Sequence, residues 1–330
     1  MTATAKKLFS YSLKAAILIL AFIFIYRRIT SNSNLKQFEI LVSHISSNRA
    51  IVTMSLVFLL MLVNWTLESL KWKYMARHLA RVTLWEAIEA VFCGLTWAVF
   101  TPNRLGEYGG RVMFLPNRRR IHGVFVMAVG SFGQNVITNV LGLTALIWFN
   151  YNFHFLQHQF PHLDPWLSLV LSLGAVIFMV LITLFYFHIG LLVQLLNRIK
   201  LLKKYHRFFD IMGKYKIGEL SKVMLFCLAR FFVFSFQYYL VIHLLMPGIP
   251  VLPMMMMVFI LFFIQSALPS LDLLDIGVRN VTASVFFSYI TGQKLAVMAA
   301  VSSIWFVNLI APAILGSVFV LKLRFFDRTA

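Results

Sequence analysis

Two stretches of the chain place acids and arginines beside prolines and glycines within apolar sequence. The first covers residues 101–111 and the second covers 269–279. Side chains four residues apart share one face of a helix, so an acid at that spacing can hold an arginine. Each stretch contains one such pair. The pairs are Glu107 with Arg111 and Asp275 with Arg279. The matching spacing predicts that the two stretches form two halves of one site.

The chemistry of these residues is typical of an anion-binding site. A helix that begins after a proline has unpaired first amides and the positive end of its dipole there. An arginine near such an end favours a phosphate group. Glycines in both stretches, including Gly106 and Gly277, permit close approach of the backbone to a helix or a headgroup. Arg104 and Asp272 are further candidates. The alternative, ion pairs that only hold two hairpins together, stays open.

The composition indicates a membrane protein. Of the 330 residues, 60% are hydrophobic and 12% are charged, whereas about 25% are charged in soluble domains. Several apolar runs approach the roughly 20 residues that span a bilayer. The net charge of +19 could indicate nucleic acid, but the basic residues lie in short loops between apolar runs. Membrane topology explains that placement better, so no nucleic-acid partner is expected.

The apolar runs predict an all-α polytopic fold that forms a single transmembrane domain over residues 1–330. Two short runs stop at prolines and are each followed by a short helix, which is typical of discontinuous helices around a binding site. If each short run and the helix that follows it form a re-entrant hairpin, six segments cross the membrane. The runs fall at about 8–26, 51–70, 84–100, 121–150, 165–196, 220–245, 253–268, 277–290 and 295–321.

The basic residues predict the orientation of these segments. With two re-entrant hairpins, twenty Lys and Arg residues fall on one side of the membrane and five on the other. The positive-inside rule then places both termini in the cytoplasm, which fits a cell (inner) membrane. Each half, 1–160 and 161–330, crosses three times, so the second half enters inverted. An inverted repeat would bring the two stretches to the midplane, as in alternating-access transporters.

Other polar residues lie within the apolar runs. Arg230 is expected to face the protein interior and to pair with an acid, and Glu68 is one candidate. Gln134 belongs to a polar stripe at helical spacing, for which hydrogen bonds between helices are the simpler interpretation. Three features could indicate a metal or cofactor site but have simpler explanations. No metal or cofactor is therefore expected. The three features are the histidines His154, His158 and His162, the acids Asp272 and Asp275, and the cysteines Cys93 and Cys227.

The two motifs resemble those of a known family. The first reads Pro102-x-x-x-Gly106-Glu107-x-x-x-Arg111 and the second ends in Gly277-Val278-Arg279. They are similar to the transmembrane flippase domain of the lysylphosphatidylglycerol synthase family. The resemblance implies a protein that moves an anionic lipid between leaflets. Full-length synthases also carry an aminoacyl-transfer domain after the membrane part, so synthase activity is not expected of this chain. Asp272, Asp275 and Asn280 depart from the family pattern, which leaves the lipid open.

The predicted function is a lipid flippase that works by alternating access without its own nucleotide site. Its substrate would be an anionic phospholipid or a polyprenyl-phosphate-linked lipid, with the phosphate on Arg111 and Arg279. Glu107 and Asp275 would hold these arginines in the empty state. Two alternatives stay open, an intramembrane transferase that uses the acids as bases or metal ligands and a membrane subunit that supports partner proteins. Whether the chain forms a homodimer is also open.

Overall fold

The computed structural model is helical throughout the part of the chain that it describes. That part comprises residues 11–20, 22–23, 26–27, 33–43, 45–99, 101, 104–159, 165–199, 206–268 and 272–321, with the backbone alone at 33–35, 38, 159, 165 and 272–276. Every regular element in these ranges is a helix, and they contain no strand. The predicted all-α class is therefore confirmed.

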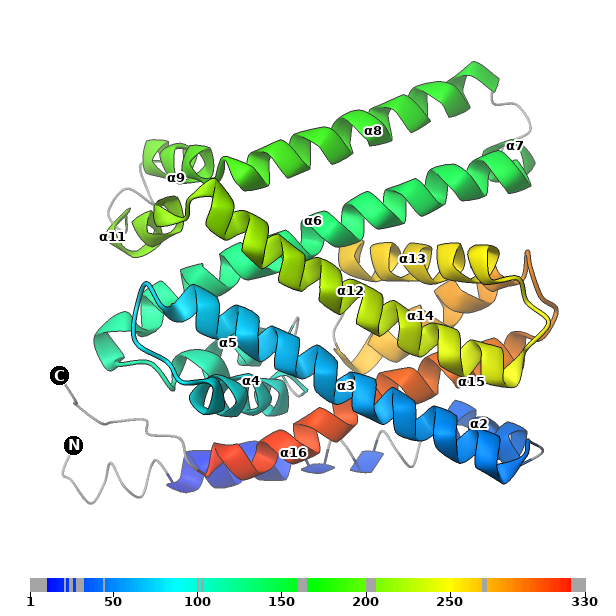
Figure 1. The fold of residues 1–330 in the computed structure, drawn as a ribbon, viewed down its shortest axis with the longest axis horizontal. Coiled ribbons are helices and arrows are strands. Elements are labelled where there is room, and N and C mark those ends of the chain that lie inside the picture. The colour runs from blue at the N-terminus through cyan, green and yellow to red at the C-terminus, as the bar shows by residue number, and fades with distance from the viewer. Residues whose placement is uncertain are drawn as a thin grey trace.

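Five helical segments in this part of the chain are long and apolar enough to cross a membrane, which indicates a multi-pass membrane protein. They run along the length of the molecule in two different inclinations, so that some of them cross in the view of Figure 1. The segments are α3 (Ser47–Ala76), α6 (Arg120–Phe153), α8 (Pro165–Phe187), α12 (Ile217–Leu245) and the continuous run of α15 (Lys294–Trp305), η4 (Phe306–Ile310) and α16 (Ala311–Val320). Of the predicted span 8–26, a helix is described over Tyr11–Leu20. A sixth crossing therefore stays a prediction.

Two pairs of shorter helices lie between the long ones. The first pair is α4 (Leu84–Ala98) with α5 (Leu105–Val112), and the second is α13 (Val251–Ala267) with α14 (Asp272–Phe287). The first pair lies toward the end of the molecule where α3 ends and α6 begins, and the second lies toward the opposite end (Figure 1). The interruptions fall where the sequence predicted them. Pro102 and Pro269 themselves lie outside the described residues.

Local sequence explains how the first pair begins and packs. Thr83 and Glu86 form a capping box at the start of α4, in which Thr83 Oγ1 accepts from the Glu86 amide at 3.2 Å. Small residues then let α5 approach α4 closely. A Cβ atom added to Gly110 would lie 2.5 Å from Gly94 Cα. A Cβ atom added to Gly106 would likewise collide with the backbone of Trp97, 2.4 Å from its carbonyl oxygen. The predicted close approach is therefore present in the first stretch.

The close approach expected at Gly277 stays a prediction. No described atom lies within 4 Å of the position where its Cβ would stand. α14 begins at Asp272, five residues before the start of the predicted run 277–290, and Gly277 is exposed on it. Aromatic rings instead pack the end of α14 against α6. Phe149 of α6 is fully buried, with ring centroids 5.2 Å from Phe286 and 5.0 Å from Tyr289.

One predicted run is divided. The apolar stretch 165–196 forms α8 and a separate helix α9 (Ile189–Arg198), which turns away at the end of the molecule (Figure 1). The break falls at His188, whose backbone is not helical and whose Nδ1 lies 2.9 Å from the carbonyl oxygen of Leu184. A side chain that hydrogen bonds to local backbone in this way competes with the helix. The remaining short elements are α2 (Ser33–Ser43), η2 (Asn117–Arg119), α7 (Phe155–Gln159), α11 (His206–Phe209) and η3 (Asp210–Lys214).

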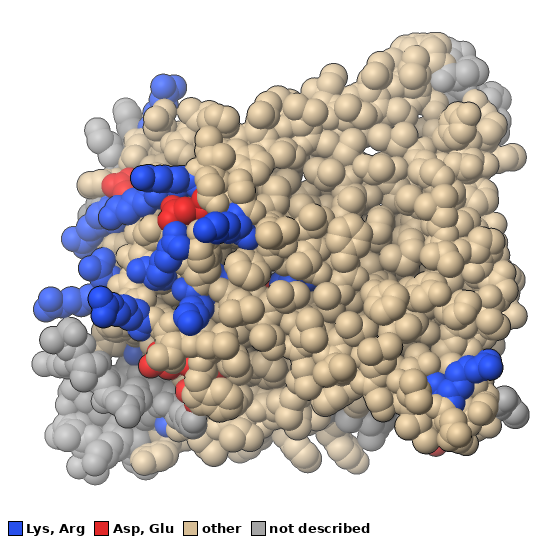
Figure 2. Space-filling view, in the orientation of Figure 1, with Lys and Arg blue, Asp and Glu red and all other residues tan. Residues whose placement is uncertain are grey.

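Basic side chains are concentrated at one end of the molecule. Figure 2 shows them at the end that carries α9 and α11 in Figure 1, and few at the other end of this face. This is the bias that the positive-inside rule describes. Lys71 was expected in this loop region, but it lies within α3 and is only 4% exposed. Its spacing from Glu68 explains the difference, because an acid and a lysine three residues apart on a helix can pair.

Candidate functional site

A cavity of about 560 Å³ lies at the middle of the long helices. Its wall is built from α3, α5, α6, α12, α13, α14 and the α15–η4 junction, so both interrupted pairs contribute to it. Polar and aromatic side chains make up most of the lining, which consists of Asn64, Trp65, Glu68, Lys71, Arg104, Glu107, Tyr108, Ser131, Gln134, Asn135, Thr138, Arg230, Phe231, Phe234, Phe262, Gln265, Ser266, Leu268, Arg279, Trp305, Asn308 and Leu309.

Glu68 of α3 is the centre of the charged network. Its carboxylate accepts from Arg111 Nη1 at 2.6 Å and from Lys71 Nζ at 2.8 Å, and it also pairs with Arg230. Only 6% of its side chain is exposed. Three cations around one carboxylate leave unbalanced positive charge in a place shielded from water. The sequence suggested Glu68 as a partner for Arg230, and the structure brings the two together.

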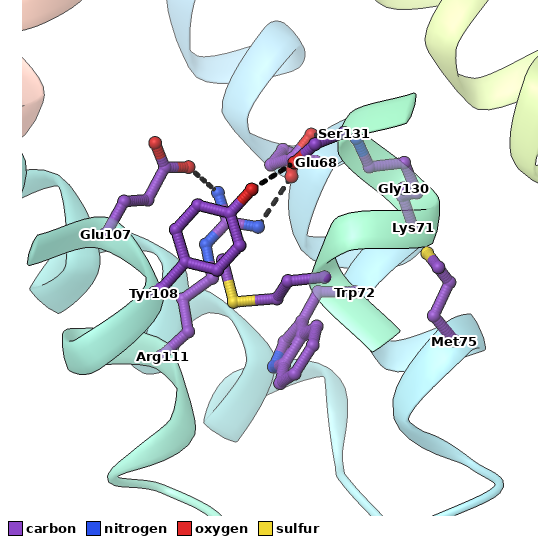
Figure 3. Close-up of a pocket in the computed structure, with 10 residues that line it drawn as sticks. Glu68, Lys71, Trp72, Met75, Glu107, Tyr108, Arg111, Gly130 and Ser131 are labelled. Carbon is purple, nitrogen blue, oxygen red and sulfur yellow. Dashed lines mark hydrogen bonds and ion pairs between the residues drawn. The ribbon is translucent and has the colours of Figure 1, made fainter. Parts of the chain in front are cut away.

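Arg111 is held between two acids. It bonds to Glu107, as its spacing predicted, and to Glu68 from another helix, as Figure 3 shows. Its side chain is 4% exposed. With Glu68 and Glu107 it lines a second cavity of about 40 Å³, which is large enough for a few water molecules. Arg111 is absent from the wall of the larger cavity. Its pairing with Glu107 is the arrangement predicted for the empty state, and its contact with a headgroup stays a prediction.

Arg104 stands at the entry to α5 with a left-handed backbone, at φ 56°. Its Nη2 lies 3.2 Å from Glu107 Oε2, and it lines the larger cavity. The helix start itself differs from the expectation of free amides. The Gly106 amide donates to Thr101 Oγ1 at 2.8 Å, so one of the amides assigned to a phosphate is already satisfied.

Arg230 and Arg279, which belong to the second half of the chain, line the same cavity. Arg230 Nε donates to Asn64 Oδ1 at 3.0 Å, and its guanidinium lies 5.3 Å from the centroid of the Trp65 ring. Arg279 of α14 lines the cavity as the sequence predicted. The side chains of Asp272 and Asp275 lie outside the described residues, so the predicted pairing of Asp275 with Arg279 stays a prediction.

The described ionisable residues of the larger cavity carry excess positive charge. Four are basic, Lys71, Arg104, Arg230 and Arg279, and two are acidic, Glu68 and Glu107. A cleft lined by charges of one sign and surrounded by apolar walls concentrates the electric field and attracts ligands of the opposite charge. The arrangement therefore suits an anionic ligand, and it can donate several charge-assisted hydrogen bonds to a phosphate.

The structure also adds wall residues that the sequence analysis missed. They are Lys71 on α3, Gln265 and Ser266 near the end of α13, and Asn308 in η4. Two signals could have found some of them. Lys71 follows Glu68 at helical spacing, and Asn308 is an amide in an apolar run four residues before Pro312. The predicted residue Gln134 does line the cavity, with its stripe neighbours Ser131, Asn135 and Thr138.

Within the residues that the structure describes, no three His, Cys, Asp or Glu side chains gather to hold a metal ion. His162 lies outside those residues, and both cysteines are buried. No protein-family model, curated protein or solved structure matches the chain. The family resemblance of the two stretches therefore stays a prediction, and the function is argued from the site alone.

Proposed function

We propose that this protein is a flippase, which binds an anionic lipid headgroup in the central cavity and moves the lipid between leaflets. The observation that carries the proposal is the excess of positive charge on the described wall of a 560 Å³ cavity, which is lined by four of the five candidate membrane spans. Ionisable groups within membrane-spanning segments are costly and usually mark a substrate path.

The cavity wall has a basic surface that suits the phosphate of a lipid and an apolar surface that suits its glycerol backbone and first methylenes. Arg230 and Arg279 supply donors for the phosphate, and they come from different helices of the second half. Phe231, Phe234 and Phe262 form an apolar side of the same cavity. The glycerol backbone and the first methylenes would contact these rings while the acyl tails stay in the bilayer.

The order of the helices supports alternating access. A long helix, an interrupted pair and a long helical segment occur in α3–α6 and recur in α12–α16, with α8 between the two sets. α3 and α12 run in opposite directions (Figure 1). In this proposal the sets form an inverted repeat with two re-entrant pairs, and rocking of one set against the other opens the cavity to each leaflet in turn. Glu68 holds the cations when no headgroup is bound.

The test is lipid movement in reconstituted vesicles. Arg230→Gln and Arg279→Gln each remove a cation from the wall, and each should slow the movement of an anionic lipid with a fluorescent acyl chain at least tenfold. Glu68 keeps Lys71 and Arg111 in the first variant, so the fold should persist, which thermal unfolding checks. Lys73→Gln, at an exposed position on the basic end, is the matched control. Undiminished movement in both cavity variants contradicts the proposal.

A further inference from the structure

The neutral part of the cavity wall restricts which headgroup it accepts. Amides and hydroxyls from α6, α13 and η4 also line the cavity. Two buried amide oxygens on this wall, Gln134 Oε1 and Asn308 Oδ1, have no hydrogen-bond partner within the described part of the chain. A buried acceptor without a donor carries a desolvation penalty, which a ligand that supplies the donor removes.

Asn308 is the more informative of the two. It is 7% exposed, and its Nδ2 donates to the carbonyl oxygen of Ile304 at 3.1 Å, which fixes Oδ1 as the free acceptor. It lies in the π-helical turn η4 between α15 and α16. Pro312 lacks the amide that would bond to the Asn308 carbonyl in an α-helix, which explains a widened turn here. Such turns are frequent at functional sites.

A phosphodiester cannot satisfy these acceptors, because it is ionised and carries no P–OH group that could donate. The remaining headgroup chemistries that can donate are hydroxyl groups and ammonium groups. The excess of described cations on the wall, Lys71, Arg104, Arg230 and Arg279 against two acids, repels an ammonium group. Hydroxyl groups satisfy the amide oxygens without that repulsion.

We infer that the ligand of this cavity is a polyol or sugar phosphate headgroup without an ammonium group. The phosphate lies against Arg230 and Arg279, and the hydroxyls donate to Asn308 and Gln134. This inference rests on the proposed lipid-binding function and narrows its substrate class.

The experiment compares four lipids with identical fluorescent acyl chains in vesicles that contain the purified protein. Phosphatidylglycerol and phosphatidylinositol carry hydroxyls, phosphatidic acid carries phosphate alone, and phosphatidylethanolamine carries an ammonium group. The first two should move at least about fivefold faster than the other two, as expected for one or two added hydrogen bonds. Phosphatidylethanolamine that moves as fast as phosphatidylglycerol overturns the inference.

Two substitutions at Asn308 sharpen the test. Asn308→Leu should bring the ratio of the rate for phosphatidylglycerol to the rate for phosphatidic acid close to one. Asn308→Asp keeps an acceptor and adds negative charge, so it should raise the rate for phosphatidylethanolamine relative to phosphatidylglycerol several-fold. Asn139→Leu, on α6 but away from the wall, is the control and should leave both ratios unchanged. Unchanged ratios in both Asn308 variants contradict the assignment.

The outcomes separate this inference from the proposed function. If phosphatidic acid moves as fast as phosphatidylglycerol, the cavity binds phosphate lipids and only the polyol inference fails. If no anionic lipid moves faster than in protein-free vesicles, both fail. Soluble glycerol 3-phosphate at concentrations comparable to the lipid should leave lipid movement unchanged, because it has no acyl chains to hold it in the bilayer. Inhibition by it at concentrations comparable to the lipid assigns the site to a soluble phosphate and overturns the lipid headgroup as ligand.

Discussion

Glu68 of α3 and Arg230 of α12 form an ion pair although 162 residues separate them in the chain. The same carboxylate binds Arg111 of α5 at 2.6 Å, so one acid connects the first interrupted pair to both long helices. A phosphate in the cavity would compete with Glu68 for Arg230, whose side chain is 15% exposed, more readily than for the enclosed Arg111. If the proposed function is correct, headgroup binding and the contact between the two helix sets would depend on each other.

The first prediction concerns the stability that Glu68 provides. Glu68→Gln leaves three neighbouring cations without their shared carboxylate, and loss of one partner from a buried ion pair costs about 3–5 kcal/mol. The melting temperature in detergent should fall by roughly 10 °C. Arg230→Gln added to this variant should recover part of the loss, because it removes one of the repelling charges.

The control for this change is Glu219→Gln at the basic end of the molecule. Glu219 pairs with Arg77, whose side chain is 43% exposed, and such pairs contribute about 0–1 kcal/mol. Glutamine also preserves the capping role at the start of α12. A melting temperature for Glu68→Gln equal to that of Glu219→Gln would show that the buried network adds no stability.

The second prediction uses the chemical reactivity of two nearby lysines. Lys71 is 4% exposed and bonded to Glu68, whereas Lys73 is exposed. A water-soluble acylating reagent should modify Lys73 in the folded protein and leave Lys71 unmodified, and both should react after denaturation. Peptide mass spectrometry measures the two sites separately. Equal modification of both lysines in the folded protein would place Lys71 in water instead of in the network.

The sequence was sufficient for the helical class, the places where two helices are interrupted and the partner of Arg111 four residues away. These features depend on apolar length, helix-breaking residues and helical periodicity, all of which are local. The contact of Arg111 with Glu68 and the place of Asn308 on the wall depend on packing between distant helices. Spacing cannot show that Arg111 is enclosed by two acids while Arg230 stays accessible. The division of the run 165–196 falls at His188, where the side chain hydrogen bonds to the carbonyl oxygen of Leu184.

The third prediction concerns the close contact between α4 and α5. In Gly110→Ala the new methyl group meets the backbone of Gly94 at 2.5 Å, so the helices must separate. Overpacking of this kind costs about 1–3 kcal/mol, and the shift would also displace Arg111 one residue away. The variant should melt several degrees lower and move lipid more slowly.

Gly174→Ala is the matched control. No described atom lies within 4 Å of the position of its Cβ, on the exposed face of α8. Alanine is about 1 kcal/mol better than glycine within a helix, so this variant should be as stable as the parent or more stable. If both alanine variants are equally stable, the contact between α4 and α5 is not tight.

The fourth prediction separates the backbone of Arg104 from its charge. A left-handed conformation costs an L-residue about 1–2 kcal/mol and suits glycine. Arg104→Gly should therefore preserve or raise the melting temperature, while Arg104→Val, with a β-branched side chain, should lower it by several degrees. Both variants remove the cation and should slow anionic lipid movement. Equal melting temperatures would argue against the left-handed helix entry.

The fifth prediction tests whether each interrupted pair returns to its own side of the membrane. Arg81 and Arg119 flank the first pair, and Gly248 and Gly292 flank the second. Single cysteines at these four positions are treated with a membrane-impermeant maleimide in intact cells. The two introduced near the second pair should react at once, and the two near the first only after permeabilisation, because the basic end is proposed to be cytoplasmic. The parent protein should stay unlabelled, since Cys93 and Cys227 are buried. Labelling of Arg81→Cys and Arg119→Cys from opposite sides would mean that the first pair crosses the membrane, and the inverted repeat would then be wrong.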